Sequence, residues 1–153
     1  MKLYLVQHGE ACSRDTDPER PLTDQGKADI DRLAVFLGQA GIRVQRVIHS
    51  GKLRAAQTAG QLAAVLAPAV QPEVSSMLDP NDDPGEFDLA TDRYQDTLVV
   101  GHLPFMSKLV AHLVTEDEDR LVTAYRPGSI VCLERENGRR WQINWMVRPE
   151  LLG

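Results

Sequence analysis

The fold is decided by Leu3-Tyr4-Leu5-Val6-Gln7-His8-Gly9-Glu10, close to the start of the chain. Residues 3–6 are apolar and favour extended structure, so they predict a β-strand that leads directly into His8. Gly9 has no Cβ, which leaves room for a tight turn or for a ligand close to the backbone. Ligands of α/β folds bind beyond the carboxyl ends of parallel strands. The pattern therefore indicates either a reactive histidine or one that merely ends an edge strand.

Composition and charge bound the class of protein. The 153 residues fit one domain, and we expect residues 1–153 to form a single one. Hydrophobic residues make up 42% and charged residues 25%, which is typical of a globular chain. The net charge of −5 argues against nucleic acid or an anionic membrane as the partner. If the substrate is anionic, positive charge must be concentrated locally.

The cellular location follows from the same features. No apolar run approaches the roughly 20 residues that a membrane-spanning helix needs, and the N-terminus lacks the features of a signal peptide. The two cysteines, Cys12 and Cys132, are far apart in the sequence and show no C-x-x-C spacing. They fit free thiols in a reducing compartment. We therefore expect a cytoplasmic protein.

Strand and helix signals alternate along most of the chain. Thr23 is a good N-cap for a helix that Gly41 ends, after a polar loop over 13–21. Strand signals follow at 44–48 and 70–74, with an alanine-rich helix at 53–66 between them. Residues 77–86 are acidic and proline-rich and predict no regular element, and a short helix is expected over 88–94.

The clearest signal of a buried strand lies at 97–100. It is followed by a helix whose first turn suits Pro104, and then by a hairpin. The two strands of this hairpin are expected at 129–134 and 140–145, joined by a turn at Asn137-Gly138. Strands that alternate with helices predict an α/β fold, with helices on both faces of a mainly parallel central sheet.

A second histidine repeats the arrangement of the first. The strand at 97–100 runs directly into Gly101-His102-Leu103-Pro104. Between the two histidines, Ser50-Gly51-Lys52-Leu53-Arg54 opens a helix with two cations, which the helix dipole disfavours there. A bound anion would resolve this conflict, and a solvated basic turn is the alternative.

If the strands that end at His8, His49 and His102 are parallel neighbours, these ends share one crevice. Two histidines and an arginine over a helix N-terminus suit a phosphoryl group. A neutral imidazole can attack phosphorus, while a guanidinium and the second imidazole hold the oxygens on which charge develops.

A metal site is the competing hypothesis for the histidines. The chain has four of them, His8, His49, His102 and His112, and none stands in an H-x-H or H-E-x-x-H spacing. His49 fits a turn or packing residue, and His112 fits a structural or exposed position inside a helix. We expect no metal.

Four motifs, in the same order, resemble the histidine phosphatase superfamily, whose fold is like phosphoglycerate mutase. Gln7-His8-Gly9-Glu10 is similar to its Arg-His-Gly signature, and Arg20-Pro21-Leu22-Thr23-Asp24-Gln25-Gly26 resembles the segment that follows. The stretch from Ser50 to Ala59 is similar to its S-x-x-x-R-A-x-Q-T-A motif, and Gly101-His102-Leu103-Pro104 to its second-histidine motif. The length and the His-Leu-Pro wording look most like the short bacterial phosphohistidine phosphatases.

The resemblance implies a three-layer α/β/α sandwich and a role for each matching residue. His8 would be the nucleophile that accepts the phosphoryl group, Arg54 would clamp its oxygens, and His102 would stabilise the transition state. Water would then hydrolyse phospho-His8, with no metal or organic cofactor. The other expected contacts to phosphate come from Gln7, Gly9, Ser50 and Lys52. The substrate would be a phosphohistidine protein, such as a phosphotransfer domain in signalling, and neither nucleic acid nor a membrane would be a partner.

The chain departs from the family at Gln7, where the signature has arginine. Gln7 can donate hydrogen bonds but carries no charge. We hypothesise that Lys52, at the same helix N-terminus as Arg54, restores part of the missing charge.

Two alternatives remain open from the sequence. One is a phosphatase for small phosphate esters, which would need a general acid. Glu10 is the candidate for that role, and the other acidic residues considered are Asp79, Asp82, Asp83 and Glu86. The other alternative is a module that binds phosphorylated ligands and has lost turnover through Gln7.

Overall fold

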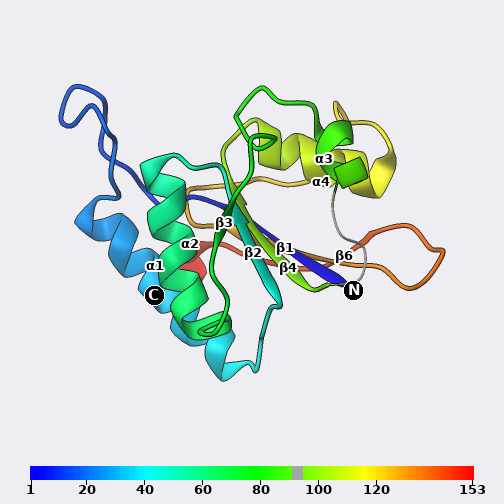
Figure 1. The fold of residues 1–153 in the computed structure, drawn as a ribbon, viewed down its shortest axis with the longest axis horizontal. Coiled ribbons are helices and arrows are strands. Elements are labelled where there is room, and N and C mark those ends of the chain that lie inside the picture. The colour runs from blue at the N-terminus through cyan, green and yellow to red at the C-terminus, as the bar shows by residue number, and fades with distance from the viewer. Residues whose placement is uncertain (91–94) are drawn as a thin grey trace.

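A six-stranded sheet forms the centre of the structure, a computed structural model that describes residues 1–90 and 95–153 (Figure 1). The strands are β1 (Lys2–Gln7), β2 (Arg46–His49), β3 (Glu73–Val74), β4 (Thr97–Gly101), β5 (Ile130–Glu134) and β6 (Gln142–Val147). Their order is β3-β2-β4-β1-β5-β6. The first four in this order are parallel, while β5 and β6 pair antiparallel. The prediction of a mainly parallel sheet is confirmed.

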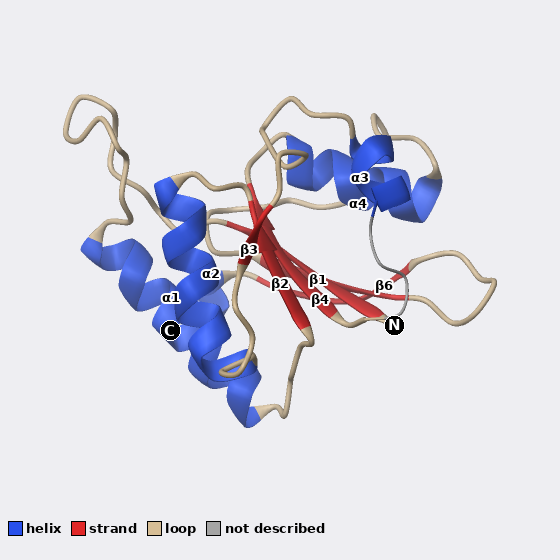
Figure 2. Cartoon of the chain, in the orientation of Figure 1, coloured by secondary structure: helices blue, strands red, loops and turns tan. Residues whose placement is uncertain are grey.

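Helices cover both faces of this sheet (Figures 1 and 2). The first pair, α1 (Asp24–Gln39) and α2 (Leu53–Leu66), lies on one face. The second pair, α3 (Pro84–Ala90) and α4 (Phe105–Thr115), lies on the other, and a 3-10 helix, η1 (Pro149–Leu152), follows β6. The predicted three-layer sandwich is confirmed. None of the described helices is long and apolar enough to cross a membrane.

The sheet separates two hydrophobic cores. Tyr4 and Val6 of β1 pack in the core beneath α1 and α2, whereas Leu3 and Leu5 pack beneath α3 and α4. Successive side chains of a strand point to opposite faces, so an unbroken apolar run is suited to a strand that is covered on both sides. β4 follows the same pattern, and all five of its residues are buried.

The turn after β1 packs directly onto the first turn of α1. Thr23 caps this helix, and its hydroxyl accepts the Gly26 N–H at 2.9 Å. A Cβ on Gly26 would lie 2.2 Å from the carbonyl oxygen of Glu10, and one on Gly9 would lie 3.0 Å from Ile30 Cγ1. Gly9 and Gly26 therefore allow the turn after β1 to approach α1 closely, and this contact fixes the backbone around Gly9.

Two predicted elements differ from the observed ones. The strand expected at 70–74 is limited to Glu73–Val74, because Pro72 lacks the N–H that pairing requires. The prediction that residues 77–86 have no regular structure is wrong at the end of this range, where α3 begins at Pro84. Asp83 Oδ1 accepts the Gly85 N–H at 2.9 Å, so Asp83-Pro84 is a helix start that we interpreted as loop.

Smaller corrections concern the remaining boundaries. The helix expected over 88–94 overlaps α3, and its residues 91–94 lie outside the described part of the chain. The strand expected at 44–48 is observed at Arg46–His49, because the Val44 N–H bonds to Leu66 instead of the sheet. The second hairpin strand begins at Gln142 rather than at 140. Pro104 precedes the first residue of α4 rather than lying within its first turn.

Replacing Gly26 by alanine tests the packing of the turn against α1. The new methyl group cannot coexist with the Glu10 carbonyl at 2.2 Å, so the backbone next to His8 must move. We expect Gly26→Ala to lower the free energy of unfolding by about 1–3 kcal/mol, measured by urea denaturation.

Gly60→Ala is the matched control, because Gly60 also lies within a helix and a Cβ there meets nothing within 4 Å. This variant should be stabilised by about 0.5–1 kcal/mol. Equal effects of the two substitutions would contradict the packing argument.

Candidate active site

The parallel register of β1 and β4 sets His8 beside His102. Gln7 pairs with Gly101 at the ends of the two strands, and the His8 N–H donates to the Gly101 carbonyl at 3.0 Å. The two imidazole rings have centroids 5.0 Å apart and are tilted by 52°. β2 pairs with the other side of β4, so the three strand ends are parallel neighbours as expected.

His8 is held as a neutral imidazole with one free nitrogen. Its Nδ1 lies 2.7 Å from the Gly9 carbonyl oxygen, which can only accept, so Nδ1 carries the proton. The lone pair is therefore on Nε2. Burial lowers the pKa of His8 to about 4; Arg54 and Arg20 add to the effect and the bond to Gly9 opposes it. At neutral pH this ring has an unprotonated Nε2, the form in which an imidazole can act as a nucleophile.

His102 is more deeply buried, with 2% of its surface exposed. Its Nε2 lies 2.6 Å from the Ser50 hydroxyl, while its Nδ1 has no partner within the described residues. Burial lowers the pKa of His102 to about 3, with His8, Arg54, Lys52 and Arg20 acting in the same direction. This ring is also neutral at neutral pH, and Nδ1 is the nitrogen left for a ligand.

Arg54 supplies a charge that has no counter-ion among residues 1–90 and 95–153. It lies in the first turn of α2, and its buried Nε has no hydrogen-bond partner in the part of the chain that is described. Burial lowers its pKa, and the guanidinium groups of Arg20 and Arg14 lower it further. These cations repel one another in the free protein, so a bound anion would be stabilised by all of them.

Thr58 joins α2 to the turn that carries His8. Its hydroxyl donates to the Arg54 carbonyl at 2.8 Å and accepts the Gly9 N–H at 3.0 Å. The side chain is completely buried. Thr58 thereby fixes the distance between α2, which carries Arg54, and Gly9. Sequence reasoning missed this role, although the spacing of four residues from Arg54 places both on one helix face.

Gln7 and Lys52, both predicted to bind phosphate, differ in their surroundings. Gln7 is 7% exposed, and its Oε1 has no partner among the described residues. Lys52 precedes α2, and its Nζ lies 3.8 Å from Asp79 Oδ1 at a half-exposed position. The charge of Lys52 nonetheless acts on the site, where it helps to lower the pKa of His102. The roles of both residues stay predictions.

The other predicted site residues are held by neighbouring groups. The Gly9 N–H is used by Thr58, and the Ser50 hydroxyl by His102. The Glu10 carboxylate is exposed and accepts the Thr23 hydroxyl at 2.5 Å. Their predicted contacts to substrate, and the role of Glu10 as general acid, stay predictions. Thr23 places the carboxylate at the N-terminus of α1.

Arg20 is a residue of the site that the sequence did not assign. Its backbone has a φ of 52°, and its Nε donates to the Cys12 carbonyl at 3.0 Å. Its charge contributes to the lowered pKa of His8, His102 and Arg54. The loop that contains it is fastened by a bridge between Ala11 and Leu22. The arginine of the R-P-L-T segment was the signal from which this could have been found.

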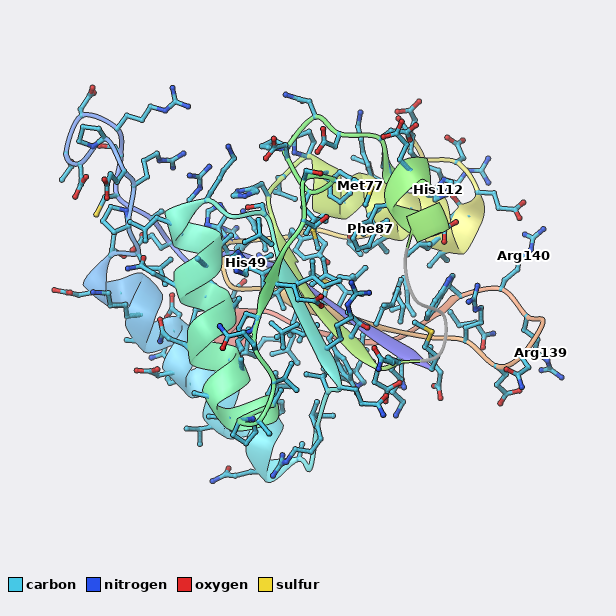
Figure 3. All side chains as sticks on the ribbon, viewed as in Figure 1. His49, Met77, Phe87, His112, Arg139 and Arg140 are labelled. Carbon is cyan, nitrogen blue, oxygen red and sulfur yellow. The ribbon has the colours of Figure 1, made fainter. Side chains whose placement is uncertain are left out.

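The positive charge of two arginines on the connection between β5 and β6 is paired and distant from the site. Arg139 and Arg140 lie on the connection between β5 and β6, at the far end of the sheet from His49, as Figure 3 shows. They lie near Glu136 and Glu116, at 3.8 and 3.4 Å. His49 itself accepts the Gly51 N–H on Nδ1 at 3.0 Å, which is the turn role expected for it.

Metal binding has no support in the described residues, where no three His, Cys, Asp or Glu side chains are grouped to hold an ion. His112 lies instead 3.4 Å from Asp88, between α4 and α3.

The chain belongs to the histidine phosphatase superfamily (branch 1), whose family model matches residues 3–79. Among individual proteins it is similar to phosphohistidine phosphatase SixA of Escherichia coli (strain K12), with 29% identity over 155 residues, 97% of this chain and 94% of SixA. An uncharacterized protein of Picosynechococcus sp. is 35% identical over 113 residues, 68% of this chain and 67% of that protein.

Solved structures show the same relationship. The structure of the protein histidine phosphatase SixA complexed with tungstate superposes with a TM-score of 0.87 at 26% identity, and 100% of both chains is covered. A putative SixA from Agrobacterium tumefaciens gives a TM-score of 0.76 at 20% identity, over 97% of each chain, which shows the fold alone.

The lowered pKa values of the two histidines predict how stability depends on pH. An unfolded histidine has a pKa of about 6.5, against about 4 for His8 and about 3 for His102 in the folded protein. Below pH 6.5 the unfolded chain therefore binds more protons, and the free energy of unfolding falls as the pH drops from about 6.5 to 4.

Chemical denaturation at a series of pH values measures this slope. The double variant His8→Gln, His102→Gln should show a shallower fall between about pH 6.5 and 4, and the same slope as the wild type between about pH 7 and 8. Identical slopes in the acid window would contradict the burial of two neutral imidazoles.

Proposed function

We propose that this protein is a phosphohistidine phosphatase, which hydrolyses the P–N bond of a phosphorylated histidine in another protein. The observation that carries the proposal is the free Nε2 of neutral His8 beside the guanidinium of Arg54 and the ring of His102. The similarity to SixA, whose name states this activity, supports the same substrate class.

The reaction would take place in two displacements on phosphorus. Nε2 of His8 attacks the phosphorus atom and a bond forms between them. The bond to the substrate imidazole breaks, and this ring, protonated on its other nitrogen, leaves as neutral imidazole. Arg54 and Nδ1 of His102 hold the phosphoryl oxygens while charge shifts over them. Water then attacks phospho-His8, which releases inorganic phosphate and restores the neutral ring.

The carboxylates near the site favour a substrate with a good leaving group. Glu10 is bonded to Thr23, Asp79 lies beside Lys52, and Asp83 caps α3. An imidazole has an unperturbed pKa of about 6.5, so it leaves far more readily than an alkoxide and needs less help from an acid. A phosphate ester would require a general acid, and Glu10 is the candidate we retain for it.

The partner and location follow from this activity. The partner would be a phosphohistidine protein of a signal-transduction or phosphotransfer system, of which a phosphotransfer domain is one candidate. The free thiols of Cys12 and Cys132 support a reducing compartment, so we propose the cytoplasm. The net charge of −5 directs any anionic partner to the cations of the site rather than to the general surface.

Trapping the intermediate tests the function. Incubation with a ³²P-phosphohistidine protein, followed by rapid quenching at alkaline pH, should place label on His8 and release phosphate on longer incubation. His8→Ala should abolish both, and parallel assays with p-nitrophenyl phosphate and sugar phosphates should give much lower kcat/KM.

Other outcomes would reject the proposal. Faster turnover of the esters would establish the small-molecule phosphatase instead. Binding of the phosphorylated protein without label on His8 or phosphate release would establish a binding module.

The missing arginine at position 7 gives a second test. Gln7→Arg adds a cation at the end of β1 and should raise kcat/KM for the phosphohistidine protein, because charge on the phosphoryl oxygens is better stabilised. If Lys52 compensates for Gln7, then Lys52→Ala should lower kcat/KM by about tenfold, and by less in the Gln7→Arg background.

Lys108→Ala is the control, since Lys108 lies in α4 and its Nζ is 4.0 Å from Glu118. It should leave turnover unchanged. An unaltered rate in Lys52→Ala would show that Lys52 does not compensate.

A further inference from the structure

The Ser50 hydroxyl lies between two hydrogen-bonding groups. Its Oγ is 2.6 Å from Nε2 of His102 and accepts the backbone N–H of Lys52 at 3.4 Å. A hydroxyl has one proton and two lone pairs. The described residues offer its proton no acceptor other than Nε2. The arrangement in which the hydroxyl proton has an acceptor is therefore the one in which Ser50 donates to His102.

This direction of donation determines where His102 carries its own proton. A neutral imidazole has one N–H and one lone pair, so a ring that accepts on Nε2 is protonated on Nδ1. Nδ1 is the nitrogen without a partner in the described chain, on a side chain that is 2% exposed. The opposite tautomer would leave a lone pair at this position, which would repel a phosphoryl oxygen.

We propose that Ser50 is a positioning residue, which keeps the proton of His102 on Nδ1 so that the neutral ring donates a hydrogen bond to a phosphoryl oxygen. The role of the donor rests on the proposed phosphatase function, whereas the position of the proton is a property of the free protein. Ser50 would thus act through His102 instead of binding phosphate itself.

The two neighbouring imidazoles would then have the same tautomer and opposite roles. Gly9 holds the proton of His8 on Nδ1, which frees the Nε2 lone pair for phosphorus. Ser50 holds the proton of His102 on Nδ1, which directs an N–H at an oxygen. A tautomer matters only for a neutral ring, and burial lowers the pKa of His102 to about 3, so this ring is neutral at neutral pH.

Nitrogen NMR of the free protein tests the proton position directly. With ¹⁵N-labelled histidine at pH 7, His102 should show a protonated, pyrrole-type Nδ1 and an unprotonated, pyridine-type Nε2. Ser50→Ala should shift the population toward the Nε2–H form, and Ser50→Thr, which keeps the hydroxyl, should restore the wild-type spectrum.

Turnover of a phosphohistidine protein provides the second measurement. A misdirected donor weakens transition-state stabilisation, so Ser50→Ala should lower kcat by about 10-fold to 10²-fold with little change in KM, and Ser50→Thr should recover most of it. Ser76→Ala, at an exposed serine after β3, is the matched control and should behave like the wild type.

A wild-type His102 with its proton on Nε2 would overturn the proposal. So would a Ser50→Ala variant with an unchanged spectrum, or one with a changed spectrum and an unchanged kcat. If the wild type does not hydrolyse phosphohistidine, the proposed function fails, while the spectra still decide the tautomer.

Discussion

The register between β1 and β4 is the constraint on which the site depends. Gln7 pairs with Gly101, so the next residue along each strand is a histidine, and the two rings lie with centroids 5.0 Å apart. A slip of one residue would turn every side chain of β1 to the opposite face. Both faces of these strands are buried in separate cores, so such a slip would expose or misplace the apolar residues of both. A Cβ on Gly101 would lie 2.7 Å from the sulfur of Met106, so a side chain there would require the Met106 side chain to shift. The hydrophobic cores thereby set the geometry of a polar site.

The site's second property is a concentration of positive charge. Arg54, Arg20 and Lys52 act together on His102, and they help keep its ring neutral in a chain whose net charge is −5. The cations and the burial of the rings both lower the pKa values of the two histidines, so each ring carries a lone pair at neutral pH. Gln7 adds a buried amide where the family signature has a further positive charge. An anion at this site would therefore be held by cations from the loop before α1 and from the start of α2.

The sequence predicted the architecture and the adjacency of His8 and His102, because long apolar runs and glycine-histidine pairs are local signals. The helix at Leu53–Leu66 is observed at its predicted bounds. What the sequence could not predict depends on contacts between distant segments. Thr58 bonding to Gly9, and Ser50 bonding to His102 across 52 residues, follow from how α2 and β2 lie against β1 and β4. The start of α3 at Pro84 was hidden for a different reason, since acidic and proline-rich composition is shared by loops and helix N-termini.

A crystal structure of the protein with vanadate bound would show whether His8, Arg54 and His102 surround one oxyanion. We expect one tetrahedral or trigonal-bipyramidal oxyanion at the carboxyl ends of β1 and β4. Its vanadium would be bonded to Nε2 of His8, and its oxygens would lie within hydrogen-bond distance of the Arg54 guanidinium and of Nδ1 of His102. Vanadate bound elsewhere on the surface, or at this edge with either imidazole turned away from Arg54, would contradict the account.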